Sequence, residues 1–423
     1  MGDRDVRSIL RELDSCGSSQ PAVARRTEKL VLASLEAVPV PILDFELARL
    51  STSDFPKYCA VLAAKALLVD PREADGTSVI AAYQELVADA SKGMFYSAPF
   101  AFSRLTRHVS RIVYERGDSS SVVWAARRAL QLASPSPDHM TPMHADFLAV
   151  CVNAKMYHVA ASLKTPKKLD SSTPYGLAAS DVQLFYYYRS LVDIARADLS
   201  SAVESFKLLF AVPAYAVTDV SIDAYKKFVL TYLILHGKSP PKPSFVNHSV
   251  NLSLTQICGI YCTLGSLADA NDESGMLKFA EENHGLFSAD KNLGLVKKAI
   301  KVTMSKHIQK LAETYVTLSI DKIAEKLSLG SVEEAEKILL DMINSRVLSA
   351  SIDQRTGIAT FYERDAESTI TKTTLNSQLD RCIQNYKRVL AMKDDLLQDP
   401  RLIEVELVAK QSRNRQEKMR LET

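Results

Sequence analysis

The 423-residue chain is too long for a single compact core, because domains usually contain about 100–200 residues. Its 52 Lys and Arg nearly balance its 50 Asp and Glu, and this net charge of +2 excludes binding of nucleic acid or anionic membranes through overall charge. The 47% hydrophobic and 24% charged residues are typical of a folded protein, and the low numbers of Gly (14) and Pro (16) favour long helices over a β-sandwich.

The N-terminal segment and the cysteines indicate a soluble protein of a reducing, intracellular compartment. Residues 1–17 carry seven charges and no apolar run, so they do not resemble a signal peptide. The six cysteines are scattered rather than spaced as a disulfide framework. The longest uncharged stretch, residues 243–268, contains amide, imidazole and hydroxyl side chains and is therefore not expected to span a membrane.

Helical repeats are predicted over residues 1–300. Residues 1–180 would form the N-terminal repeats, and residues 181–300 would form the repeats of a second module. Apolar residues three and four apart recur in segments of roughly 12–18 residues, and these segments are separated by Pro, Gly and polar turns. Helices joined by short turns over such a length usually stack as a solenoid. Ala202, Phe206 and Pro213 fit the second helix of a tetratricopeptide unit, whereas the Trp and Gly of its first helix are absent, so we expect a degenerate, tetratricopeptide-like repeat.

Residues 301–364 show the order of elements of a winged-helix subdomain. Three helices are expected, and two strands in which apolar side chains alternate with period 2 follow them. Ser331 and Glu334 form a predicted capping box at the start of the third helix, and Gly357 supplies a turn between the strands. The expected helices cover 305–316, 320–327 and 331–344, and the expected strands cover 347–353 and 358–362.

A single long helix is predicted over residues 375–398, and a flexible tail over 399–423. Apolar residues spaced by threes, fours and a seven form a narrow stripe on this helix, and no later helix of the sequence could cover it. We expect the stripe to enter a helical bundle between subunits; the alternative is that it folds back on its own domain. The stripe comprises Leu379, Ile383, Tyr386, Leu390 and Leu397.

Several segments resemble the PCI-domain family, a module of helical repeats and a winged helix that occurs in the proteasome lid, the COP9 signalosome and a translation initiation factor. They are 290–298 (DKNLGLVKK), 311–329 (LAETYVTLSIDKIAEKLSL) and 350–354 (ASIDQ). Residues 184–188 (LFYYY) and 222–238 are most similar to members from the COP9 signalosome. The implied fold class is mostly α: a helical-repeat solenoid followed by a winged-helix (PCI) subdomain and a C-terminal long helix.

The resemblance covers roughly residues 140–400, and the chain departs from the family pattern at two places. Arg189-Ser190 stands where the family usually has Gly-Gly, which bears on how closely the helices can pack there. Ser345-Arg346 stands where an Asp-Gly turn usually precedes the first wing strand, which bears on the geometry of that turn.

The resemblance implies a scaffold role rather than catalysis. The COP9 signalosome removes the ubiquitin-like modifier Nedd8 from cullins and so regulates cullin–RING ubiquitin ligases, while its metalloprotease centre lies on a different subunit. The expected partners are the other signalosome subunits, with the first and eighth as neighbours, and cullin–RING ligases through the whole complex, in cytoplasm and nucleus. A PCI scaffold subunit of the proteasome lid is the alternative of the same kind.

No catalytic, cofactor or metal site is expected. A zinc hydrolase of the deneddylating kind needs His-x-His, an acidic ligand and a Glu base, and the sequence contains no His-x-His. Cys258 and Cys262 lack two further ligands nearby, so we interpret them as small core residues. Phosphate-binding loops and a nucleophile elbow are missing from the sequence, and the run 186–188 (YYY) is interpreted as helix packing rather than base stacking.

A stand-alone winged-helix protein that binds nucleic acid is the alternative from a different class, and its charge argues against it. A helix that reads DNA places Arg, Lys, Asn or Gln toward the groove. Residues 331–346 instead contain four acidic and two basic residues. We therefore expect no nucleic-acid partner.

The second wing strand is predicted to be an exposed sheet edge. Such edges are normally protected or paired with a partner strand. The residues expected to contact a neighbouring subunit there are Ile358, Thr360 and Phe361.

Overall fold

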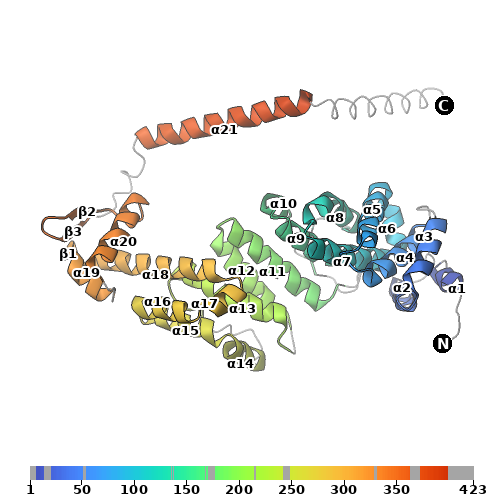
Figure 1. The fold of residues 1–423 in the computed structure, drawn as a ribbon, viewed down its shortest axis with the longest axis horizontal. Helices are drawn as coiled ribbons and strands as arrows, with labels where there is room; N and C mark the ends of the chain where they lie inside the picture. Colours follow the sequence, from blue (N-terminus) through green and yellow to red (C-terminus); the bar gives the residue numbers. More distant parts are fainter. Residues whose placement is uncertain are drawn as a thin grey trace. The chain divides into compact units, whose positions relative to one another are not determined.

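The structure is a computed structural model of the whole chain. It describes residues 6–13, 21–50, 54–134, 136, 138–166, 168–169, 177–213, 216–241, 248–327, 331–362 and 372–398. In these ranges the chain forms helices α1 to α21 and a three-stranded sheet, so the predicted mostly α fold is confirmed (Figure 1). The chain divides into two compact units, one of residues 1–311 with 321–338 and one of residues 312–320 with 339–423.

The first ten helices, α1 to α10, are short to medium in length. They are α1 Val6–Arg11, α2 Pro21–Leu35, α3 Val40–Arg49, α4 Phe55–Leu68, α5 Ala74–Asp89, α6 Lys92–Ser97, α7 Pro99–Arg116, α8 Val123–Ala133, α9 Pro142–Asn153 and α10 Tyr157–Ala161. The helices that follow are α11 Ala179–Ala195, α12 Leu199–Ala211, α13 Asp219–His236, α14 His248–Ile257, α15 Gly259–Asp269, α16 Glu273–Glu282, α17 His284–Ala289, α18 Leu293–Thr314, α19 Ile320–Lys326, α20 Val332–Asn344 and α21 Lys372–Gln398.

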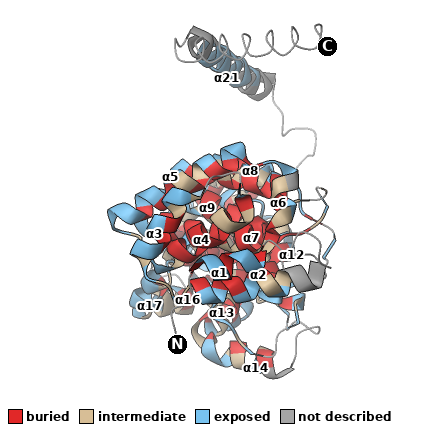
Figure 2. Ribbon diagram, turned by 90° about the vertical axis from the view of Figure 1, so that its right-hand side faces the viewer, coloured by how far each residue is buried: buried red, intermediate tan, exposed pale blue. Residues whose placement is uncertain are grey.

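The helices of the first unit pack on helices close to them in sequence, as a repeat array does. Contacts run from α4 to α7, from α7 to α9, from α9 to α11, and onward through α12 and α13 to α15. Figure 2 shows that α4, α7 and α9 turn their buried residues inward. Ala202 and Phe206, which fit the second helix of a tetratricopeptide unit, are both fully buried. The small Ala202 side chain leaves room for the paired helix to approach.

Five helices end in the same tight turn, and none of the five turns uses glycine. After each helix and one intervening residue, a non-glycine residue adopts a positive φ between 53° and 61°. The next residue then donates its N–H to the carbonyl five residues earlier, which satisfies an orphan carbonyl of the helix end. The five residues with positive φ are Lys155, Ala197, Asn271, Lys291 and Arg346.

The turn between α11 and α12 illustrates how the device reverses the chain. Ala197 has φ 61°, and its N–H donates to the carbonyl of Ile194 at 3.0 Å. Asp198 donates its N–H to the carbonyl of Asp193 at 2.9 Å and accepts the N–H of Ser201 at its side chain at 3.2 Å. The same residue therefore closes one helix and caps the next.

Replacing Ala197 with glycine should stabilise the protein, because the left-handed conformation costs an L-residue about 1–2 kcal/mol and costs glycine little. We expect the Ala197→Gly variant to gain about 1 kcal/mol in the free energy of unfolding in urea. The matched control is Arg196→Gly, one residue earlier, where φ is −84° and glycine brings no relief. A gain of equal size at both positions would contradict the explanation.

A buried carboxylate holds the start of α7. Oε2 of Glu28 accepts the N–H groups of Phe100 and Ala101, each at 3.0 Å. Burial disfavours the charged form and raises the pKa of Glu28 to about 7, although the two hydrogen bonds act in the opposite direction. At neutral pH this group is therefore close to its titration midpoint inside the protein.

Glu28 should make folding stability depend on pH. The folded-state pKa is raised above the ordinary value of 4.5, so between pH 4.5 and 7 the folded protein keeps a proton that the unfolded chain releases. The contribution of Glu28 is thus present below pH 4.5 and lost as the pH rises to 7. Glu28→Gln cannot titrate, so its free energy of unfolding should rise relative to wild type by on the order of 2 kcal/mol across this window. Parallel pH profiles of the two proteins, measured by urea unfolding, would contradict the assignment.

The sheet contains a strand that the sequence pattern did not predict. Strands β1 (Thr317–Ser319), β2 (Ala350–Asp353) and β3 (Ile358–Phe361) form an antiparallel sheet in the order β1-β3-β2. The helix expected over 305–316 begins earlier, at Leu293, and ends at Thr314, so β1 follows it almost directly. A strand of three residues is too short to show a period of 2, which explains why the sequence did not reveal it.

The two later helices, the cap at Ser331 and the turn at Gly357 agree with expectation, whereas the strand expected over 347–353 begins only at Ala350. Helices α19 and α20 lie within one or two residues of their predicted limits. Oγ of Ser331 accepts the N–H of Glu334 at 3.2 Å, as expected for an N-cap. Gly357 adopts φ 65° in the turn between β2 and β3, a conformation that glycine adopts without strain.

Candidate interaction surfaces

Helix α21 exposes a stripe of large apolar side chains. Leu379, Ile383, Tyr386 and Leu390 are exposed by between 37% and 65% of their surface, although such side chains are normally buried. Every side chain described on this helix, from residue 379 to 393, is solvent exposed (Figure 2). The side chain of Leu397 and the predicted tail over 399–423 lie outside the described residues.

The prediction that β3 is an exposed sheet edge is wrong. Thr360 pairs with Thr317 of β1 and also with Ser351 of β2, so β3 is the central strand. Phe361 is buried and Thr360 is half-buried, whereas Ile358 remains 39% exposed. The expected contact role of Ile358, Thr360 and Phe361 therefore loses its basis in edge pairing, because β1 occupies that position. The edge strands of this sheet are β1 and β2.

Helix α20 presents carboxylates to solvent. Glu333, Glu334 and Asp341 are exposed. Among the described residues of this helix, Lys337 is the only exposed basic side chain. Negative charge on this face repels phosphates, which agrees with the sequence argument against DNA binding.

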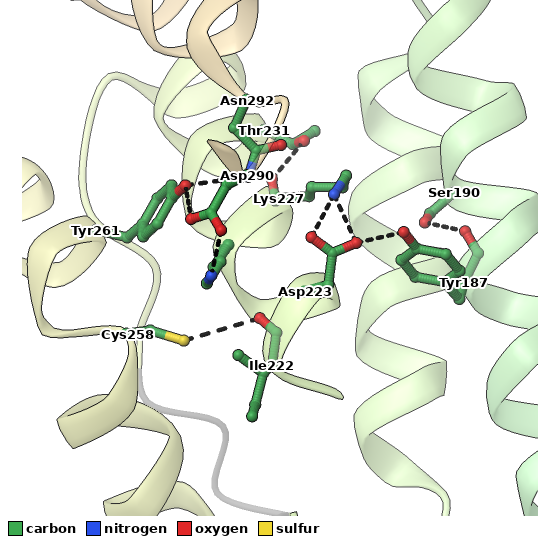
Figure 3. A network of polar contacts seen from close by, with 11 residues as sticks. Tyr187, Ser190, Ile222, Asp223, Lys227, Thr231, Cys258, Tyr261, Asp290 and Asn292 are labelled. Atoms are coloured by element: carbon green, nitrogen blue, oxygen red, sulfur yellow. Dashed lines mark hydrogen bonds and ion pairs between the residues drawn. The ribbon is translucent and has the colours of Figure 1, made fainter. Parts of the chain in front are cut away.

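A polar network joins helices α11 and α13 in the first unit (Figure 3). The hydroxyl of Tyr187 donates to Oδ2 of Asp223, and Nζ of Lys227 lies 2.5 and 2.6 Å from the two carboxylate oxygens. Lys227 also lies 5.9 Å from the ring centroid of Tyr187, within the range of a cation–π contact. Burial and the nearby Asp223 carboxylate both raise the pKa of Tyr187, so this hydroxyl stays protonated and acts as a donor.

The same network continues from α13 to α15 and the start of α18. Nζ of Lys226 donates to Oδ1 of Asp290 at 2.7 Å, and the hydroxyl of Tyr261 donates to Oδ2 at 2.8 Å. The amide of Asn292 donates to the hydroxyl of Tyr261 at 3.1 Å. Burial alone would raise the pKa of Asp290, but the bonds from Lys226 and Tyr261 outweigh it and hold the pKa below its ordinary value.

The network contains residues from three distant segments of the sequence that carry the family resemblance. Tyr187 belongs to 184–188, Lys226 to 222–238, and Asp290 to 290–298. Tyr187 of α11 bonds Asp223 of α13, as Figure 3 shows, and Lys226 of α13 bonds Asp290, which lies just before α18. These segments of the resemblance thus supply side chains that link neighbouring helices of the array.

Lys226 and Asp290 should be energetically coupled. Removing either charge leaves a partly buried partner without its hydrogen bond, which costs about 1–3 kcal/mol. A double-mutant cycle of Lys226→Met and Asp290→Asn, followed by urea unfolding, should give a coupling energy above about 0.5 kcal/mol. The matched control is the exposed pair Arg111 and Glu115, 4.0 Å apart on α7, for which little or no coupling is expected. Additive effects at Lys226 and Asp290 would contradict a shared network.

The thiol of Cys258 is buried and protonated. Burial raises the pKa of Cys258 to about 12, so its thiol stays protonated and donates to the carbonyl of Ile222 at 3.8 Å. Cys258 is buried as expected for a small core residue, while Cys262 is half-buried. Among the described residues, no three His, Cys, Asp or Glu side chains are grouped to hold a metal ion. None of the described helices is long and apolar enough to span a membrane.

Comparisons with known proteins identify both halves of the chain. Residues 40–250 match the family described as COP9 signalosome complex subunit 3, N-terminal helical repeats, and residues 280–363 match the PCI domain. COP9 signalosome complex subunit 3 from Dictyostelium discoideum is 31% identical over 292 residues, which are 68% of this chain and 69% of the relative. The Arabidopsis thaliana protein of the same name is 28% identical over 311 residues, 73% of this chain and 71% of the relative. The resemblance inferred from the sequence and the order of helical repeats before a PCI domain are confirmed.

Proposed function

We propose that this chain, which belongs to the family of COP9 signalosome subunit 3, is a non-catalytic scaffold subunit of the signalosome. In this role it contributes to a complex that removes Nedd8 from cullins and regulates cullin–RING ubiquitin ligases in the cytoplasm and nucleus. Its neighbours in the complex are the first and eighth subunits. Family membership supports the choice of complex, because the two relatives that carry this name match about 70% of the chain.

The exposed stripe of α21 is the observation that supports assembly through this helix. Its residues recur at intervals of three and four, the spacing with which helices pack into coiled coils and bundles. An isolated helix that exposes such a stripe in water leaves its apolar surface unburied, so a bundle with neighbouring subunits would stabilise it. Of the three residues first expected to make contacts in the sheet, Ile358 is the one whose side chain is exposed enough to reach a partner.

Purification of the native complex through the tagged full chain tests this function. The other signalosome subunits and Nedd8-isopeptidase activity should co-purify with the chain. Introducing charge into the stripe, as Ile383→Glu with Leu390→Glu, should lower the recovery of those subunits by at least about tenfold, since a buried carboxylate opposes bundling. Both side chains are exposed in the isolated chain, so its own unfolding curve should not change.

The matched control is Arg388→Glu, because nine residues at about 100° each place Arg388 on the face opposite Leu379. This variant should assemble like wild type. Recovery of proteasome lid subunits in place of signalosome subunits would overturn the proposed function. Undiminished assembly of the stripe variant would instead overturn only the role of α21.

A further inference from the structure

A cavity of about 450 Å³ lies in the N-terminal repeats, among α6, α8, α9 and the residues that follow α10. These helices pack on one another within the first hydrophobic cluster (Figure 1). The volume falls within the range of about 300–1,000 Å³ that is usual for small-molecule sites. The cavity is far in sequence from both the sheet and α21, and the scaffold role makes no use of it.

The charge of the lining is one-sided. Lys92, Arg127 and Lys164 line the cavity, and the described lining contains no carboxylate. Among the ion pairs of the described residues, none involves any of these three cations. Like charges around one cavity repel each other, so an anion between them would be stabilised by all three.

Neutral hydrogen-bond donors accompany the cations. Nδ1 of His144 accepts the N–H of Thr141 at 3.0 Å, so the ring carries its proton on Nε2. Burial lowers the pKa of His144 to about 4, and the ring is therefore neutral at pH 7. The Nε2–H of His144 makes no hydrogen bond to another described residue. The side chains of Gln131 and Ser134 add further donors to the lining.

The remaining lining is apolar. Leu130, Phe147 and Leu163 contribute hydrophobic surface, and Phe147 is almost completely buried. A ligand that fits both parts must combine a strongly anionic group with a compact apolar or aromatic group. Phosphate is the anion that best matches several cations and N–H donors, because it carries nearly two charges and accepts through three oxygens.

We propose that this cavity binds a small organic phosphate, with the phosphate group held by Lys92, Arg127 and Lys164 and the organic group against Leu130, Phe147 and Leu163. The volume of about 450 Å³ matches a small molecule, whereas a phosphorylated peptide would need an extended groove.

Calorimetric titration of the full-length chain tests the proposal, with phenyl phosphate as probe in phosphate-free buffer at about 0.15 M ionic strength. We expect saturable binding with a Kd below about 1 mM. Arg127→Gln and Lys164→Gln should each weaken binding by at least about tenfold, because each removes a charge-assisted hydrogen bond. Lys207→Gln on α12 is the matched control, since it removes an exposed positive charge outside the cavity and should leave the Kd unchanged.

Three further probes separate the contributions. Phenol lacks the phosphate and should show no saturable binding, while inorganic phosphate lacks the ring and should bind more weakly than phenyl phosphate. The proposal is overturned if phenyl phosphate does not bind, if phenol binds as well, or if both cavity variants bind like wild type. Binding of a phosphoserine peptide in the absence of phenyl phosphate binding would also overturn it. Urea unfolding of each variant establishes that a lost signal does not reflect a lost fold.

Discussion

The geometry of the helical array rests on tight reversals at the helix ends. An amphipathic helix buries its apolar stripe only if a later helix returns along it, and a tight reversal sets the direction of that return within a few residues. The left-handed residue at Lys155, Ala197, Asn271 or Lys291 turns the chain within two residues of the helix end. Each of these residues accepts a conformational strain of about 1 kcal/mol, and the burial gained by the following helix exceeds it.

Buried and partly buried ion pairs then fix how far each helix is shifted along its neighbour, which the turns do not determine. Arg107 of α7 contacts Asp146 of α9 at 3.2 Å and Asp181 of α11 at 2.7 Å. One guanidinium therefore joins α7, α9 and α11. Apolar packing alone tolerates some sliding of one helix along another, whereas a charge-assisted hydrogen bond is directional and restricts it. Lys226 with Asp290 plays the same part farther along the chain. The apolar residues of the array divide into two clusters, one ending at Val192 and one beginning at Val203, and the bond from Tyr187 to Asp223 joins a helix of the first to a helix of the second.

The sequence predicted those features that depend on local pattern and missed those that depend on pairing at a distance. Helix periodicity, the cap at Ser331 and the turn at Gly357 involve neighbours in sequence, and all three were correct. The central position of β3 depends on the pairing of Leu318 with Ala359, about forty residues away. A strand of three residues carries no sequence pattern that would identify this partner. At Arg346 the family resemblance marked the position of a turn, but the residue type did not indicate its φ of 57°, because glycine is the residue that signals such a conformation. The polar network of Tyr187, Asp223 and Lys227 required the helices to be placed first.

The net charge of the chain does not show how its charged side chains are distributed over the structure. A net charge of +2 excludes a strong field around the whole molecule, and this conclusion holds. Locally, however, α20 presents carboxylates, while the cavity beside α8 is lined by three cations and by no described carboxylate. At physiological salt, charges farther apart than about 8 Å are largely screened from each other, so each region acts on its own surroundings. One nearly neutral chain therefore presents two regions of opposite charge, and only their placement in the fold distinguishes them.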